Sequence, residues 1–283
     1  MTYQLLQKLG QQTLEQAGVP EAALDARLLL EWACAIDRST LLAHGDREAD
    51  PAQETKYLAV IAKRADRIPL QHLTGVQDFM GLTFEVNENV LIPRQDTEIL
   101  VEEVMKDIHG GSAILDLCTG SGCILISLLK YSNECHGVGV DLSTAALEVA
   151  NRNAQNLIPD RDCTFICGDL FENVTGKFDI LTSNPPYIPT AIVDTLMPEV
   201  RDHEPRLALD GTADGLHFYR RILKECKSYL NKGAMIFFEI GYDQGEAVRT
   251  LMQQEGCLEV KIVKDYAGLD RVVTGVYSPK DGL

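Results

Sequence analysis

Residues 113–124 read AILDLCTGSGCI: a short apolar run, a turn of small residues, and the start of a second apolar segment. An apolar run of this length before a glycine-containing turn is typical of a buried β-strand that leads into a helix. Because glycine has no Cβ, the backbone of such a turn can approach a ligand closely. We therefore expect this stretch to form the first strand and the ligand-binding turn of an α/β domain.

Further strand-like runs continue to the end of the chain, and they are HGVGV, CTFIC, FDILTS, AMIFFEI, EVKIV and RVVTGVY. Helical segments separate them until the last two, which follow one another directly. This alternation predicts a mostly parallel sheet wrapped by helices, a Rossmann-like α/β fold. The final pair predicts an antiparallel hairpin that closes the sheet.

The chain before this sheet predicts a separate domain. Residues 1–74 place apolar side chains at helical spacing and contain no residue of evident catalytic type, so we expect a small helical bundle that docks a substrate. In residues 75–93 apolar positions alternate around Met80 and Gly81, which predicts a β-hairpin linker. Residues 94–283 are then the catalytic domain.

Charge and composition exclude several classes of protein. The formal net charge of −16 has the wrong sign for binding a phosphate backbone, so we expect no direct nucleic-acid partner. The eight cysteines form no CxxC pair and the six histidines have no metal-ligand spacing, which argues against a metal site or a disulfide framework. We find neither a signal peptide nor an apolar run of about 20 residues, and therefore expect a cytoplasmic protein without a membrane segment.

The turn after the first strand predicts the cofactor. Asp116 closes that strand, and a carboxylate at the mouth of the turn would repel a pyrophosphate and attract a cation. Leu125 stands where a dinucleotide-binding GxGxxG turn has its third glycine. S-Adenosylmethionine carries both an ammonium and a sulfonium group. The turn residues that we expect to contact it are Cys118, Thr119, Gly120, Ser121 and Gly122.

The next two strands end in residues that suit the rest of this cofactor. Asp141 ends HGVGV and can accept hydrogen bonds from both ribose hydroxyls, although it can also serve as a helix cap with Ser143. Asp169 and Leu170 follow CTFIC and offer a polar acceptor and an apolar contact for adenine. In an open α/β sheet the carboxyl ends of the strands form the ligand site, which favours the binding role.

The fourth strand ends in Asn184, Pro185, Pro186 and Tyr187, the proposed catalytic and substrate-binding residues. The prolines have no N–H and restrict the residues before them, so this loop offers rigid carbonyl acceptors. A substrate amide can donate one hydrogen to the Asn184 side-chain oxygen and the other to the Pro185 carbonyl, while Tyr187 packs on the amide plane. These residues predict methylation of an amide nitrogen.

At this point the chain resembles the HemK/PrmC family of protein-glutamine methyltransferases, which act on class I peptide chain release factors. The resemblance rests on RIPLQHLTG (67–75), VLIPRQDTEILVE (90–102), DLCTGSGCI (116–124), NPPYIP, EPRLALDG (204–211), EIGYDQGEAV (239–248) and KDYAGLDRVV (264–273). It implies a class I S-adenosylmethionine-dependent fold, and S-adenosylhomocysteine as product. It also implies cofactor contacts from Cys118–Gly122, Asp141, Leu170 and Asn184, with the glutamine of the GGQ motif received by Asn184–Tyr187.

One segment departs from the family, and two alternative functions stay open. The usual IPRPETE reads IPRQDTE here, where Thr97 and Glu98 can also be explained as a helix cap and a first-turn acid. The roles of Arg94, Asp96, Glu204 and Glu239 stay undecided, and so does the preferred release factor. The alternatives are an exocyclic-amino methyltransferase acting on nucleic acid and a non-catalytic release-factor-binding module. We expect a monomer.

Overall fold

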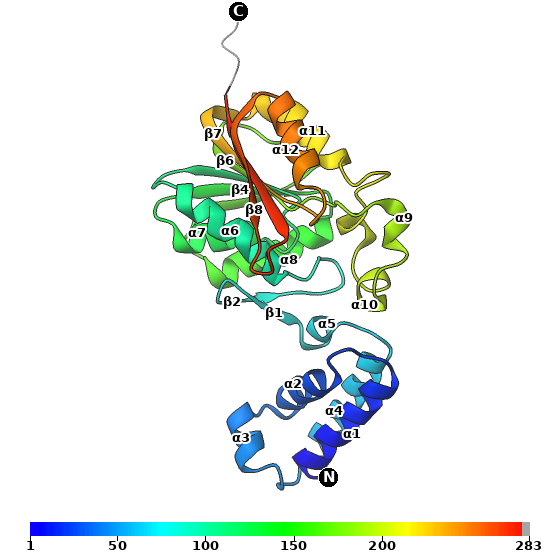
Figure 1. Cartoon of the computed structure of the whole chain (residues 1–283). Coiled ribbons are helices and arrows are strands. Elements are labelled where there is room, and N and C mark those ends of the chain that lie inside the picture. The colour runs from blue at the N-terminus through cyan, green and yellow to red at the C-terminus, as the bar shows by residue number, and fades with distance from the viewer. Residues whose placement is uncertain (279–283) are drawn as a thin grey trace, which may run out of the picture. The chain divides into compact units, whose positions relative to one another are not determined.

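The computed structural model describes residues 1–278, which form two compact units (Figure 1). The first unit consists of Met1–Val76 together with Met197–His203, and the second of Gln77–Leu196 together with the chain from Glu204 onward. The short return of the chain to the first unit at Met197–His203 has no counterpart in the sequence prediction.

The first unit is a bundle of short helices. Its helices are α1 (Tyr3–Gln16), α2 (Ala22–Cys34), α3 (Arg38–Ala43), α4 (Pro51–Ala65), α5 (Leu70–Thr74) and α10 (Pro198–Arg201). Asp50 caps α4 in a capping box with Gln53, and Pro51 occupies the first turn, where its missing N–H has no cost. Leu6, Leu30 and other apolar side chains of α1, α2 and α4 fill its core.

Buried ion pairs hold α10 within this unit. Glu199 accepts hydrogen bonds from Arg64 Nη2 at 2.9 Å and from Arg67 Nε and Nη2 at 2.7 and 2.6 Å. Arg64 Nε also donates to Asp25 Oδ2 at 2.7 Å. Each buried charge therefore has an opposite partner, which is the condition under which an interior accepts charged groups.

The predicted hairpin is formed by β1 (Val76–Phe79) and β2 (Leu82–Glu85), which pair in a two-stranded sheet. Met80 and Gly81 have φ values of 50° and 70°, so both turn residues take the left-handed backbone that a two-residue hairpin turn requires. Phe79 and Phe84 are buried and meet edge to face with 6.0 Å between ring centroids.

The second unit contains the predicted sheet, with strand order β5-β4-β3-β6-β7-β9-β8. The strands are β3 (Ala113–Leu117), β4 (His136–Asp141), β5 (Cys163–Cys167), β6 (Phe178–Ser183), β7 (Leu230–Glu239), β8 (Cys257–Lys264) and β9 (Asp270–Tyr277). Strands β3 to β7 pair in parallel, whereas β9 pairs antiparallel with both β7 and β8. The α/β fold with a closing antiparallel hairpin is confirmed, and its last strand lies between β7 and β8.

Helices cover both faces of this sheet (Figure 1). Helices α6 (Gln95–Asp107), α7 (Cys123–Tyr131) and α8 (Thr144–Leu157) pack on one face, and α11 (His217–Glu225) and α12 (Gly245–Gln254) on the other. Short helices α9 (Thr190–Val193), η1 (Arg206–Ala208) and η2 (Cys226–Ser228) lie in the connections. Among the helices of residues 1–278, none combines the length and the apolar character needed to cross a membrane.

Candidate functional site

A cavity of the second unit lies at the carboxyl ends of β3, β4, β5 and β6, where a parallel sheet is expected to bind ligands. Most of the predicted site residues line it: Cys118, Thr119, Gly120, Ser121, Asp141, Asp169, Leu170, Asn184 and Pro186. The structure does not bring Asp116, Gly122, Pro185 or Tyr187 to the lining. The first set can therefore contact a ligand in the cavity, whereas the second set lies behind its wall.

The turn after β3 has the backbone that a close ligand approach requires. Cys118 and Gly120 have φ values of 59° and 55°, and the left-handed region is costly for a side chain such as that of Cys118. Ser121 is 2% exposed, and its Oγ has no hydrogen-bond partner among the described residues. Gly122 serves packing, because a Cβ there would lie 2.9 Å from Ile126 Cδ1.

Asp116 has another role than the sequence prediction gave it. It is fully buried, and its carboxylate accepts hydrogen bonds from Thr119 Oγ1 at 2.6 Å and from Thr182 Oγ1 at 2.8 Å. Burial raises the pKa of Asp116 to about 7. In the structure this carboxylate is turned into the protein and ties the turn to β6 through Thr182.

Asp141 is bound to the same turn from the next strand. Its Oδ2 accepts from Gly120 N at 2.9 Å, and its Oδ1 accepts from Ser143 N at 2.9 Å. A carboxylate oxygen accepts more than one hydrogen bond, so both oxygens can still receive ligand hydroxyls at the cavity wall. The cap of α8 is Ser143 itself, whose Oγ accepts from Ala146 N at 3.2 Å.

The turn after β5 presents one apolar and one charged side chain. Leu170 is 5% exposed with a φ of 57°, an unusual backbone for a large apolar residue. Asp169 lines the cavity, but Arg221 Nη1 already donates to its two carboxylate oxygens at 3.0 and 3.1 Å. Leu170 is therefore the freer contact for a ring that enters the cavity.

The loop after β6 is fixed by residues that the sequence analysis missed or misassigned. Asn184 Nδ2 donates to Thr97 Oγ1 at 3.4 Å, which leaves the Asn184 side-chain oxygen as an acceptor. Thr97 does not cap α6, as one interpretation of the sequence had it: the cap position is Arg94, and Thr97 lies inside the first turn, 2% exposed. Its burial beside the loop has no signature in the local sequence.

Two glycines press against the same loop. A Cβ on Gly211 would lie 2.7 Å from Tyr187 Cα, and a Cβ on Gly215 would lie 2.2 Å from the Tyr187 carbonyl oxygen. The Ile188 carbonyl also accepts from Gly211 N at 2.8 Å. The EPRLALDG segment thus ends in a glycine because the backbone of the proline loop passes directly over it.

An ion pair lies at another wall of the cavity. Arg94 lines the cavity and donates to Glu204 Oε1 at 2.6 Å. Glu204 is 6% exposed, its Oε2 has no partner among the described residues, and burial raises its pKa. The segment that follows it, Pro205, Leu207 and Ala208, also lines the cavity.

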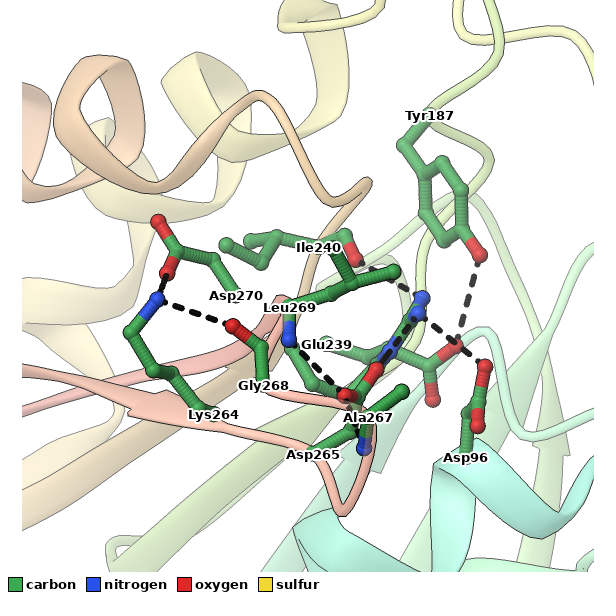
Figure 2. Close-up of polar contacts among 11 residues, drawn as sticks. Asp96, Tyr187, Glu239, Ile240, Lys264, Asp265, Ala267, Gly268, Leu269 and Asp270 are labelled. Atoms are coloured by element: carbon green, nitrogen blue, oxygen red, sulfur yellow. Dashed lines mark hydrogen bonds and ion pairs between the residues drawn. The ribbon is translucent and has the colours of Figure 1, made fainter.

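A second polar cluster contains Asp96 and Glu239 (Figure 2). Arg271 Nη2 pairs with Asp96 Oδ2 and with Asp265 Oδ2, both at 3.0 Å. Glu239 ends β7, is 1% exposed, and accepts from the Tyr187 hydroxyl at 3.4 Å. The loop that begins with Asn184 is therefore held at its other end by a buried carboxyl group.

Two family models match this chain. Residues 5–75 match the PrmC N-terminal domain, and residues 94–199 match the methyltransferase small domain. The first match covers the helical unit up to the hairpin, and the second covers β3 to β6 with the cavity residues at their ends.

Relatives match nearly the whole chain. It is 42% identical to a protein of Caulobacter vibrioides over 94% of this chain and 93% of that protein, and 44% identical to one of Moorella thermoacetica over 94% and 96%. Both relatives bear the name release factor glutamine methyltransferase. The structure also resembles a solved methyltransferase from Pyrococcus furiosus, with a TM-score of 0.52 and 18% identity over 70% of this chain and 90% of that one, a likeness of fold alone.

Proposed function

Because the chain belongs to the family of release factor glutamine methyltransferases, we propose that it transfers a methyl group from S-adenosylmethionine to the side-chain amide nitrogen of the GGQ glutamine in class I peptide chain release factors. The resemblance stated from the sequence is confirmed, and so is the expected methyltransferase fold. The matched region covers 93% and 96% of the lengths of these two relatives.

The cavity fits S-adenosylmethionine in its chemistry. Asp141 offers two carboxylate oxygens to the ribose hydroxyls, and Leu170 offers an apolar surface to adenine. Ser121 Oγ is buried with no hydrogen-bond partner among residues 1–278, so it has a hydrogen bond to give to a polar group of the ligand. When bound, the cofactor supplies an electrophilic methyl group, and S-adenosylhomocysteine is the product.

Asn184 is the observation that carries the proposal. Since its amide nitrogen is tied to Thr97, its oxygen is the group presented for recognition, and an oxygen selects a substrate that donates hydrogen. The second acceptor, the Pro185 carbonyl, lies between Asn184 and Pro186, which both line the cavity. Two acceptors spaced by one residue suit the two hydrogens of a primary amide.

These two hydrogen bonds address the difficulty of the reaction. An amide nitrogen is a poor nucleophile because its lone pair is delocalised into the carbonyl group. Accepting both of its hydrogens stabilises the positive charge that develops on the nitrogen as it attacks, and holding the nitrogen in line with the methyl group removes a further entropic barrier. The methylated nitrogen is strongly acidic and releases its proton readily, so no strong base is required.

The proposal assigns a role to each part of the chain and a partner to the enzyme. We propose that the helical unit of residues 1–74 docks the release factor, that 75–93 is the linker and 94–283 the catalytic domain, and that the enzyme is a monomer that binds no nucleic acid directly. The net charge of −16 supports this choice over the nucleic-acid alternative. All eight cysteines are free thiols, which suits a reducing cytoplasm.

The test is transfer of label from S-adenosylmethionine to a purified release factor, followed by mass spectrometry of the modified peptide. We expect one methyl group on the GGQ glutamine. A release factor with glutamate at that position should take no label, because a carboxylate has no amide hydrogens and meets two acceptors. Label on lysine, arginine or a nucleic-acid base would refute the proposal, and absence of any transfer would favour the binding-module alternative.

A further inference from the structure

Glu239 is a buried carboxyl group that the mechanism above does not use. It is 1% exposed at the end of β7, its Oε1 accepts a hydrogen bond from the Tyr187 hydroxyl at 3.4 Å, and the Thr97 hydroxyl lies near enough to lower its pKa. Its Oε2 has no hydrogen-bond partner among residues 1–278. A carboxyl group that is buried and half satisfied costs stability, so packing alone does not explain it.

Arg271 lowers the pKa of Glu239 but forms no ion pair with it. Arg271 already binds Asp96 and Asp265, and its Nη1 donates to the Ile240 carbonyl at 3.4 Å. Burial raises the pKa of Glu239 to about 7, although the nearby Thr97 hydroxyl and the Arg271 guanidinium act in the opposite direction. Perturbed acids of this kind gather at functional sites more often than elsewhere.

The position of Glu239 connects it to both ends of the proline loop. Tyr187, the last residue of NPPY, contacts it directly. Asn184, the first residue, donates to Thr97 Oγ1, and the Thr97 hydroxyl lies next to Glu239. One carboxyl group at the end of β7, an interior strand of the sheet, thus contacts or lies near the partners of both residues at the ends of the proline loop.

Resting on the proposed function, we propose that Glu239 is a positioning residue for glutamine methylation, which holds Tyr187 directly and Asn184 through Thr97. The acceptor oxygen of Asn184 must meet the substrate amide within a few tenths of an ångström for the hydrogen bond to form well. Glu239 does not line the cavity, so it positions Tyr187 and Asn184 without touching the substrate.

The test is a double-mutant cycle on the single-turnover rate with both substrates saturating. Glu239→Leu and Tyr187→Phe should each lower the rate constant roughly 10-fold to 100-fold, the size of effect that misplacing a reacting group produces. The double variant should be little slower than Glu239→Leu alone, because Glu239→Leu already removes the contact with the Tyr187 hydroxyl. Glu239→Gln keeps an acceptor and should recover most of the lost rate, with the affinity for S-adenosylmethionine unchanged throughout.

Two comparisons separate this role from a general structural one. Glu246→Leu changes an acid on α12 that is 70% exposed, and it should leave the rate unchanged. Losses that multiply in the double variant, or a normal rate in Glu239→Leu, would overturn the assignment.

If Glu239→Leu does not fold, Thr97→Val repeats the test on the Asn184 side against the same criteria. A wild-type protein that transfers no methyl group contradicts the proposed function itself, a result distinct from these.

Discussion

Glu199 and Glu239 are both buried glutamates, one in each unit, with opposite electrostatic surroundings. Glu199 receives hydrogen bonds from Arg64 and Arg67, and its pKa is lowered because those hydrogen bonds outweigh the cost of burial. Glu239 accepts a hydrogen bond from the Tyr187 hydroxyl, and burial raises its pKa to about 7 although Thr97 and Arg271 lower it. The fully paired Glu199 holds α10 in place. Glu239 has no such pairing and lies beside the NPPY loop, which is the setting in which a perturbed acid indicates a functional role.

The largest effect on stability should come from breaking the saturated cluster. Glu199→Ala removes one of the two carboxylates that pair with the buried Arg64 and releases α10, so we expect the first unit to lose about 3 kcal/mol. Trp32, the single tryptophan, lies in α2 and reports on this unit alone when unfolding is followed by fluorescence. The control is Asp202→Ala, which removes an exposed ion pair with Arg201 and should cost less than about 1 kcal/mol. If Glu199→Ala and Asp202→Ala lowered the free energy of unfolding equally, the Glu199 ion pairs would not be the ones that stabilise this unit.

The unsatisfied acid should show itself in the pH dependence of stability. The pKa of Glu239 is raised from 4.5 to about 7 in the folded chain, so the folded state binds this proton more tightly than the unfolded state does. The contribution of this proton to the free energy of unfolding is therefore complete below pH 4.5 and is lost as pH rises through 7. The loss is on the order of 3 kcal/mol for a shift of this size. Urea unfolding of wild type and Glu239→Gln across this range measures it: the variant should gain relative stability with rising pH. A difference that stays constant from pH 5 to 8 would show that Glu239 does not titrate in this window.

The site residues that the sequence predicts lie in continuous stretches of chain, whereas the residues that it misses act through contacts between distant positions. The strand ends with Asp141 and Leu170, and the NPPY loop, were predictable because each is written in one continuous stretch of chain. Thr97 lies 87 positions before Asn184, and Glu199 lies 135 positions after Arg64, and both contacts exist only in the folded structure. Asp116 was placed correctly on its strand, but the direction of its side chain depends on Thr182 of the neighbouring strand.

A smaller effect is expected from the ribose site. Asp141→Ala removes the acceptor for the hydroxyls and also the anchor of Gly120 N, so affinity for S-adenosylmethionine should fall roughly 10-fold to 100-fold, equal to a loss of about 1.4–2.8 kcal/mol. Calorimetric titration of the variant measures this directly. An unchanged affinity would refute the ribose assignment, whatever happens to the rate of methyl transfer.

Asn184 is the residue on which the proposed amide recognition depends most, and single-turnover methylation of a release factor by Asn184→Ala tests that role most directly. Because the hydrogen bond from the substrate amide matters most in the transition state, the rate constant should fall on the order of 100-fold with both substrates saturating, and the affinity for S-adenosylmethionine should change little. A variant that methylates the GGQ glutamine at the wild-type rate would contradict the amide-binding role of Asn184.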